Sequence, residues 1–312
     1  MSPAALECLS WSWILGYGPD NHLSFDGLRG KLVALAGANG GGKTSVLHAL
    51  HIAMFGRPMP SDGEEVDMQY IFNGEAPKEV ERSRVALVFR SEGVRYLVRR
   101  EFEKSGAVAA CTLHLVDATG GLGEAVAEGP DDVDRETGRM FGRSRDAVVC
   151  NFAIDGDNEF NVPEEARGDV GLLGELAGIC SAVLGDTPDY GPRCVSVELY
   201  DDDKPGLFLT GRPLQCASRF QITGLGLALR VARAKTGLTE CGFDHFFCDQ
   251  FLPENLIDLL RGVLAVGEYA SVFFTAPRAE LADKADLVIT TGGTGRGRNA
   301  LRFGEWPLAV EA

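Results

Sequence analysis

The 312-residue chain has few of the residues from which metal and disulfide sites are built. It contains eight cysteines and five histidines, and no two cysteines form a CxxC pair, so a zinc site is not expected. Scattered cysteines of this kind are typical of buried free thiols in a reducing compartment. No apolar run is long enough to cross a bilayer, and Met1-Ser2-Pro3 does not begin a signal peptide. We therefore expect an intracellular protein that is neither secreted nor embedded in a membrane.

Basic residues are also scarce relative to acidic ones. The chain has 30 Lys and Arg against 45 Asp and Glu, a net charge of −15, which excludes binding of nucleic acid by bulk attraction. Any DNA contact would need a local basic face, although the same arginines are explained as well by solvated strand edges. The candidates form two groups, Arg95, Arg99 and Arg100, and Arg296, Arg298 and Arg302.

One glycine-rich segment is the most informative part of the chain. It reads Gly37-Ala38-Asn39-Gly40-Gly41-Gly42-Lys43-Thr44, the full G-x-x-x-x-G-K-T pattern of a phosphate-binding loop. Lys31–Ala36 before it predicts a buried strand, and Ser45–Phe55 after it predicts a helix that ends at Gly56. Backbone N–H groups of such a loop surround a phosphate, Lys43 reaches the terminal phosphates and Thr44 ligates Mg²⁺. The sequence therefore predicts ATP contacts from Gly37 through Ser45.

A phosphate loop needs an acidic partner to hold the magnesium ion, normally an Asp at the end of a neighbouring buried strand. The apolar run Phe243–Cys248 predicts such a strand, and Asp249 closes it. Alone, an Asp in this position is as often a turn former. With the phosphate loop upstream, we predict that Asp249 and Thr44 bind Mg²⁺.

The rest of the chain predicts strands first and alternating strands and helices later, which is typical of an α/β protein with a mainly parallel sheet. Residues 117–138 are rich in Gly, Asp and Glu, and we expect a surface loop there. The other predicted elements are two strands around a turn at 17–21, a hairpin of 85–89 and 96–100, a strand at 111–116, a helix at 167–179, a strand pair at 195–200 and 207–209, helices at 219–234 and 254–265, and strands at 271–275 and 287–291.

Several of these motifs, in this order, resemble one family. Residues 37–56 resemble the ATPase heads of SMC-like proteins, and most closely the SbcC-type double-strand-break repair ATPases with their phage and large-virus relatives. Ala217-Ser218-Arg219-Phe220-Gln221, followed by an Ala-Leu helix, resembles the signature motif of that family. Further likenesses are found at Leu6–Phe25 for the opening strands, at 163–179 for the segment that leads into the coiled coil, at 253–256, and at Thr275–Asp286 for the closing switch region.

The resemblance implies a P-loop NTPase of the ABC-ATPase head type, with a mixed, mainly parallel core sheet and an antiparallel N-terminal β-subdomain. It implies an N-lobe at 1–184, a junction at 185–193 in place of the coiled coil, and a C-lobe at 194–312, the two lobes forming one composite domain. Either the coil was lost naturally or the two lobes were joined artificially, and the sequence is compatible with both.

The resemblance also implies a mechanism. Two heads would pair around ATP and Mg²⁺ as a homodimer, and Ser218 of one head would contact the γ-phosphate held by Lys43 of the other. The paired heads would clamp DNA in double-strand-break repair or recombination, with a calcineurin-like nuclease as partner. For Ser218 alone, an ordinary helix N-cap is the simpler explanation.

The chain departs from the family at positions that matter for hydrolysis. Gln250 stands where the family has the Glu that activates water, and an amide cannot act as a base; Glu→Gln here is also a common trapping substitution. Ala276 replaces the switch histidine, Asp155 the loop glutamine, and Arg219 a signature glycine. We predict a head whose catalytic positions are Lys43 and Gln250 and whose hydrolysis is slow or impaired. The alternatives are a nucleotide-gated scaffold without hydrolysis and a transporter-type ABC ATPase, which nothing else in the sequence favours.

Overall fold

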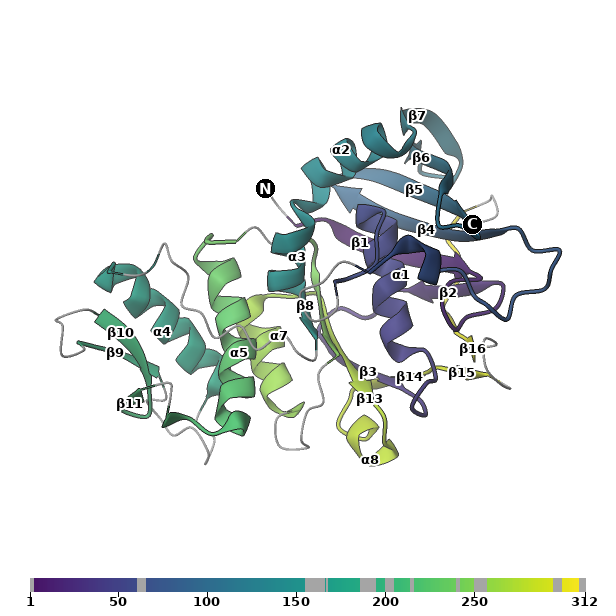
Figure 1. The fold of residues 1–312 in the computed structure, drawn as a ribbon. Coiled ribbons are helices and arrows are strands. Elements are labelled where there is room, and N and C mark those ends of the chain that lie inside the picture. The colour runs from purple at the N-terminus through teal and green to yellow at the C-terminus, as the bar shows by residue number, and fades with distance from the viewer. Residues whose placement is uncertain are drawn as a thin grey trace.

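The computed structural model describes residues 3–60, 66–154, 166, 168–185, 195–199, 205–213, 216–239, 242–249, 257–293 and 299–308. Two large sheets organise these residues (Figure 1). Among the described helices, none has the length and apolar character that a membrane span requires. The helices lie beside and between the sheets.

The first sheet has seven strands and is antiparallel except at one edge, where β17 runs parallel to β2. Its long central strands β4 and β5 form the hairpin expected from the sequence, turning at Glu92-Gly93. In spatial order the strands are β17 (Arg302–Phe303), β2 (Asn21–Ser24), β1 (Ala5–Ser12), β4 (Arg82–Ser91), β5 (Val94–Glu103), β6 (Val108–Val116) and β7 (Leu122–Glu128).

The second sheet has five strands, all parallel. Its strands come from both halves of the chain, and β3 coincides with the strand expected immediately before the phosphate loop. In spatial order the strands are β14 (Leu287–Thr290), β3 (Lys31–Ala36), β13 (Ser271–Ala276), β12 (His245–Asp249) and β8 (Phe152–Ile154). Two small antiparallel sheets complete the strands: β9 (Val195–Leu199), β10 (Pro205–Leu209) and β11 (Arg212–Pro213), and β15 (Gly292–Gly293) with β16 (Asn299–Ala300).

The described helices are α1 (Lys43–Phe55), η1 (Met68–Tyr70), α2 (Pro130–Phe141), α3 (Ser144–Asn151), α4 (Val170–Leu184), α5 (Arg219–Lys235), α7 (Leu259–Gly267) and α8 (Ala279–Ala282). Helix α1 ends as the sequence predicts, because Gly56 adopts a left-handed conformation and its N–H donates to the Ile52 carbonyl at 2.8 Å. Helix α4 begins three residues later than expected, where the Asp169 carboxylate accepts from the N–H of Leu172.

The parallel sheet separates two apolar cores. Successive residues of a strand point to opposite faces, so Val33 of β3 joins one core and Leu32 joins the other. The first core lies between the two large sheets and contains α1, most of whose residues are buried. The second core packs α4, α5 and α7 on the far face of the parallel sheet, together with β9 and β10 (Figure 1). Helix α1 is apolar on several sides because it has sheets on both sides.

The expectation of a surface loop at residues 117–138 is wrong. The structure places strand β7 at Leu122–Glu128 and helix α2 from Pro130 onward in this segment. Pro130 at the first helical position with Asp131 and Asp132 in the first turn is a helix-start signal. The acidic composition hid it, because only one narrow stripe of α2, with Val133 and Phe141, is buried.

Candidate nucleotide-binding site

The phosphate loop connects β3 to α1 and depends on glycines in conformations that other residues avoid. Gly40 has a φ of 77° and Gly42 a φ of 86°, both left-handed. Two other glycines allow close approach: a Cβ on Gly41 would lie 2.8 Å from the Ala38 carbonyl oxygen, and one on Gly37 would lie 2.5 Å from that of Thr291. Alternating left-handed residues of this kind are typical of backbone concavities that bind anions. Ala38, Asn39 and Gly40 are exposed, so the loop is accessible to a ligand.

Lys43 begins α1 and lies folded over the loop. Its Nζ donates to the carbonyl oxygens of Gly37, at 2.8 Å, and Ala38, at 2.9 Å. Burial lowers the pKa of Lys43, and the negative charge of Asp249 opposes that shift. The ammonium group is therefore held at the mouth of the loop by neutral oxygens, which a phosphate can replace with stronger charged acceptors.

The structure brings the predicted magnesium ligands to the same edge of the parallel sheet. Thr44 lies exposed in the first turn of α1. Asp249 is the last residue of β12, and the register through β13 places it level with the end of β3, where the loop begins. A hydroxyl and a carboxylate are oxygen ligands of the kind that Mg²⁺ takes, with phosphate oxygens and water completing the shell. These residues fit a nucleotide–magnesium complex.

Ser218 lies on the other side of the parallel sheet, at the N-terminus of α5. It is exposed, and its hydroxyl accepts from the Gln221 N–H at 3.2 Å while the Gln221 side chain accepts from the Ser218 N–H at 3.0 Å. This is a capping box. In the described residues Ser218 thus acts as a helix N-cap, and its contact with a nucleotide in a second head stays a prediction.

Other predicted positions are partly outside the described residues. Gln250 and Asp155 lie outside them, and of Arg219 the backbone alone is described. Ala276, the last residue of β13, is buried, and its carbonyl oxygen accepts from the N–H of Gly37 at 3.3 Å. The position expected for the switch histidine therefore touches the start of the phosphate loop through its backbone and offers only a methyl group.

The motif did not reveal two polar side chains that contact the phosphate loop. The Tyr17 hydroxyl donates to the carbonyl oxygen of Gly42 at 3.1 Å, and the Asn299 amide donates to that of Gly40 at 3.3 Å. Tyr17 comes from the turn before β2, and Asn299 is the first residue of β16, so both are remote from the loop in sequence. The turn chemistry around Tyr17 was visible in the sequence, but nothing in it pointed to the loop.

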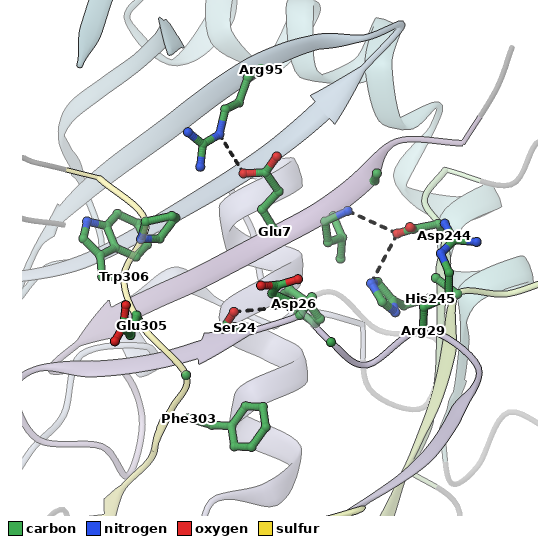
Figure 2. Close-up of a pocket in the computed structure, with 17 residues that line it drawn as sticks. Glu7, Ser24, Asp26, Arg29, Arg95, Asp244, His245, Phe303, Glu305 and Trp306 are labelled. Carbon is green, nitrogen blue, oxygen red and sulfur yellow. Dashed lines mark hydrogen bonds and ion pairs between the residues drawn. The ribbon is translucent and has the colours of Figure 1, made fainter. Parts of the chain in front are cut away.

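A cavity of about 710 Å³ lies at the opposite end of the parallel strands (Figure 2). Its walls include Arg29, Asp244, His245 and Ala270, which lie at or just before the starts of β3, β12 and β13. The phosphate loop follows the other end of β3, roughly 20 Å away at about 3.3 Å per residue. The cavity is therefore separate from the nucleotide site.

Three polar side chains beside this cavity form a chain that superficially suggests a hydrolase. His245 Nδ1 lies 2.6 Å from Ser271 Oγ, and its Nε2 lies 3.3 Å from Asp244 Oδ1 (Figure 2 shows the second contact). Burial raises the pKa of Asp244 to about 6 and lowers that of His245 to about 3. Ser271 is completely buried, so it cannot attack a substrate. The Asp244 carboxylate instead accepts from the Leu6 N–H at 3.1 Å and joins the two large sheets.

Part of the candidate basic face is wrong. Adjacent residues of β5 point to opposite faces of the sheet, and Arg100 points into the core with a side chain that is 1% exposed. Arg95, on the other face, pairs with Glu7 at 2.6 Å. Arg100 cannot reach DNA, and Arg95 shares the Glu7 carboxylate with Arg90, which also pairs with it at 2.6 Å. Arg296 and Arg298 lie outside the described residues, and Arg302 pairs with Asp20 at 3.7 Å.

Comparisons with known proteins agree with this geometry. A family model described as an AAA domain matches residues 14–113, which contain the phosphate loop. A comparison with curated proteins gives no match. The sequence matches therefore cover the first third of the chain, and the rest of the comparison comes from structures.

Three solved structures are similar over almost the whole chain. An Smc head bound to the C-winged helix domain of ScpA has a TM-score of 0.65 at 15% identity, covering 95% of this chain and 96% of that one. The SMC head domain from Thermotoga maritima has a TM-score of 0.61 at 17% identity, covering 97% and 100%. An Smc head with an extended coiled coil, bound to the C-terminal domain of ScpA derived from Pyrococcus furiosus, has a TM-score of 0.67 at 12% identity, covering 96% of each. The chain therefore has the fold of an SMC-like, ABC-type ATPase head.

Proposed function

We propose that this protein is an ATP-binding head that pairs with a second copy when ATP is bound and acts in DNA double-strand-break repair or recombination, with slow hydrolysis. The observation that carries the proposal is the phosphate loop at the end of β3, where Gly40 and Gly42 are left-handed and Lys43 lies over the loop, an arrangement that suits an anion. The SMC-like fold supports the head assignment, and the resemblance to SbcC-type ATPases supports the DNA role.

Each residue of the site has a defined task in this proposal. The N–H groups of the loop and the Lys43 ammonium bind the β- and γ-phosphates, so Lys43 exchanges its bonds to Gly37 and Ala38 for phosphate oxygens. Thr44 and Asp249 hold the magnesium ion, which neutralises phosphate charge when bound. Ser218 of the partner head contacts the γ-phosphate with the N-terminus of α5, a favourable site for an anion. ATP thereby bridges the two copies, and ADP does not.

Hydrolysis depends on Gln250, which orients water by hydrogen bonding but cannot take its proton. General-base catalysis contributes roughly 100- to 10,000-fold to a rate, so we expect ATP binding to survive while turnover is slow. A buried methyl group at Ala276 in place of an imidazole also favours slow turnover. This same pair of residues supports the second candidate, a nucleotide-gated scaffold that binds DNA or protein without hydrolysing ATP.

The partner proteins follow from likeness alone. Two of the similar Smc heads are bound to a domain of ScpA, which supports a protein partner for this head as well. The resemblance to SbcC-type ATPases makes a calcineurin-like nuclease the partner that we propose.

The test is ATP binding, steady-state hydrolysis and light scattering on the purified protein, with Gln250→Glu alongside. We expect the wild-type protein to bind ATP, to dimerise with ATP but not with ADP, and to hydrolyse it slowly; Gln250→Glu should raise turnover roughly 100-fold or more. If both proteins bind ATP and dimerise but neither hydrolyses it, the scaffold is the correct function. Absence of ATP binding by the wild-type protein would refute both.

A further inference from the structure

Two side chains from outside the phosphate-loop motif donate hydrogen bonds to carbonyl oxygens of the loop. The Tyr17 hydroxyl donates to Gly42 O at 3.1 Å, and the Asn299 amide donates to Gly40 O at 3.3 Å. Tyr17 is completely buried and Asn299 is 8% exposed. Neither belongs to the phosphate-loop motif, and neither has been given a role in nucleotide binding above.

The position of these donors controls where the loop's N–H groups point. A trans peptide unit is planar, so its C=O and N–H point in opposite directions, and the described residues contain no cis peptide. A donor that holds Gly42 O therefore also orients the N–H of Lys43, on the other side of that peptide. Gly42 O accepts from the Val46 N–H of α1 at 3.3 Å as well as from Tyr17, so Tyr17 adds to a constraint that the helix already imposes. The N–H of Gly41, which Asn299 fixes through Gly40 O, donates to Ala38 O within the loop at 2.9 Å. Tyr17 thus acts on the peptide that enters α1.

The aromatic ring of Tyr17 adds a steric constraint to this hydrogen bond. A Cβ on Gly42 would lie 2.7 Å from Cε2 of Tyr17 and 2.9 Å from Nδ2 of Asn299. The ring and the amide therefore occupy the space that a side chain at position 42 would need. Together with the left-handed φ of 86°, this leaves the Gly42–Lys43 peptide little room to rotate.

The turn that carries Tyr17 is itself held in an unfavourable conformation. Trp13 has a φ of 55° and Leu15 a φ of 51°, values that residues other than glycine rarely adopt. The Trp13 N–H donates to Gly18 O at 3.1 Å, and the buried Asn73 amide donates to the carbonyl oxygen of Tyr17 at 2.8 Å. Strained backbone that the surrounding structure holds in place is common at functional sites. Here the strained turn places the Tyr17 hydroxyl against the phosphate loop.

Asn299 joins the same turn to the C-terminal hairpin, the antiparallel strand pair β15 and β16. Its backbone N–H donates to Gly16 O at 3.0 Å, and its carbonyl oxygen accepts from Gly18 N–H at 3.1 Å. Strand β16, which begins at Asn299, is therefore fixed to the turn on both sides of Tyr17. The turn, the hairpin and the phosphate loop form one hydrogen-bonded unit.

We propose that Tyr17 is a positioning residue for nucleotide binding: its hydroxyl helps to hold the Gly42–Lys43 peptide in the orientation that binds phosphate, and Asn299 braces the Gly40–Gly41 peptide of the same loop. The proposal rests on the nucleotide-binding function proposed above. Its consequence is that two residues outside the motif set the affinity of the loop for the phosphate groups of ATP and ADP alike, since both nucleotides place phosphate against the loop.

The test compares Tyr17→Phe with a matched control, Tyr269→Phe. Tyr269 is also buried, and its hydroxyl donates to the carbonyl oxygen of Cys150 at 2.7 Å, at the start of β13 and far from the loop. Both variants lose one phenol-to-carbonyl bond. Equilibrium binding of ATP and ADP with Mg²⁺ is measured by titration well below the unfolding midpoint of each protein, and the midpoints are measured in parallel.

We expect Tyr17→Phe to weaken the binding of ATP and of ADP by about 3- to 10-fold, which corresponds to the loss of one hydrogen bond. Tyr269→Phe should bind both nucleotides like the wild type, with an unfolding midpoint similar to that of Tyr17→Phe. Asn299→Ala, which keeps the backbone bonds to the turn, should also weaken binding and serves if Tyr17→Phe does not fold. Unchanged affinity in Tyr17→Phe and Asn299→Ala, or an equal loss in Tyr269→Phe, would overturn the positioning role while leaving nucleotide binding in place. Failure of the wild-type protein to bind either nucleotide would overturn both proposals.

Discussion

Two alanine substitutions in the phosphate loop should separate backbone strain from steric contact. Gly40 and Gly42 have similar left-handed φ angles, 77° and 86°, so alanine costs each about 1–2 kcal/mol. Their surroundings differ. A Cβ on Gly40 meets nothing within 4 Å, whereas one on Gly42 meets Tyr17 at 2.7 Å and Asn299 at 2.9 Å.

The additional cost at position 42 follows from those distances. Ordinary contact begins near 3.4 Å, so the Tyr17 ring or the loop must move by several tenths of an ångström. Overpacking of this kind costs about 1–3 kcal/mol. If the loop moves, that energy is lost from nucleotide binding, and 1.4 kcal/mol corresponds to about tenfold in affinity. We expect Gly42→Ala to bind ATP about 5- to 150-fold more weakly than Gly40→Ala.

The assay is equilibrium titration of ATP with Mg²⁺ into both variants and the wild type, with thermal unfolding in parallel. Unfolding midpoints show whether the clash at position 42 weakens the fold instead of the site. Equal affinities in the two variants, at equal midpoints, would mean that Tyr17 and Asn299 do not press on the loop and would refute the reasoning.

Two further predictions concern stability. Burial lowers the pKa of His51 from 6.5 to about 3, so between these pH values the unfolded chain binds a proton that the folded protein does not, and the free energy of unfolding falls as the pH falls. His51→Phe should therefore remove about 1.4 kcal/mol per pH unit from the slope of the free energy of unfolding against pH. Urea unfolding at pH 4.5, 5.5 and 7 measures this slope, and an unchanged slope would contradict the prediction. Arg100 donates to the carbonyl oxygens of Ala53, at 3.0 Å, and Met54, at 3.3 Å, and to the Asp134 carboxylate, at 2.6 Å. Arg100→Met keeps the side-chain volume but removes these donors, and should lower the free energy of unfolding by about 2–5 kcal/mol. An unfolding midpoint equal to that of the wild type would show that these bonds make no net contribution to stability.

The phosphate loop could be predicted from the sequence because its determinants are local. An apolar run, consecutive glycines and a helix-forming segment lie side by side, and the structure places β3 and α1 almost where the pattern puts them. Asp249 was also predictable, because a carboxylate that ends a buried strand lies at the edge where parallel strands finish. The role of Asp249 in binding magnesium, and the roles of the other site residues, stay predictions.

Features that depend on distant contacts could not be predicted. Arg100 looked like part of a basic strand, and its burial depends on the C-terminus of α1, more than forty residues away. Helix α2 was missed because its short apolar stripe is diluted by acidic residues. Tyr17 was identified only as part of a turn, since its partners Gly42 and Asn299 meet it only in the folded chain.

The contact between Asn299 and Gly40 has a consequence for synthesis on the ribosome. The two residues are 259 positions apart along the chain, and at about 5–20 residues per second their emergence is separated by roughly 10–50 s. During that interval the residues of β3 and of the loop have been synthesised, whereas β13 and β14, which flank β3, and Asn299, which braces the loop, follow only near its end. We therefore expect the nascent head to acquire its full nucleotide affinity only after Asn299 has been synthesised and has reached the loop.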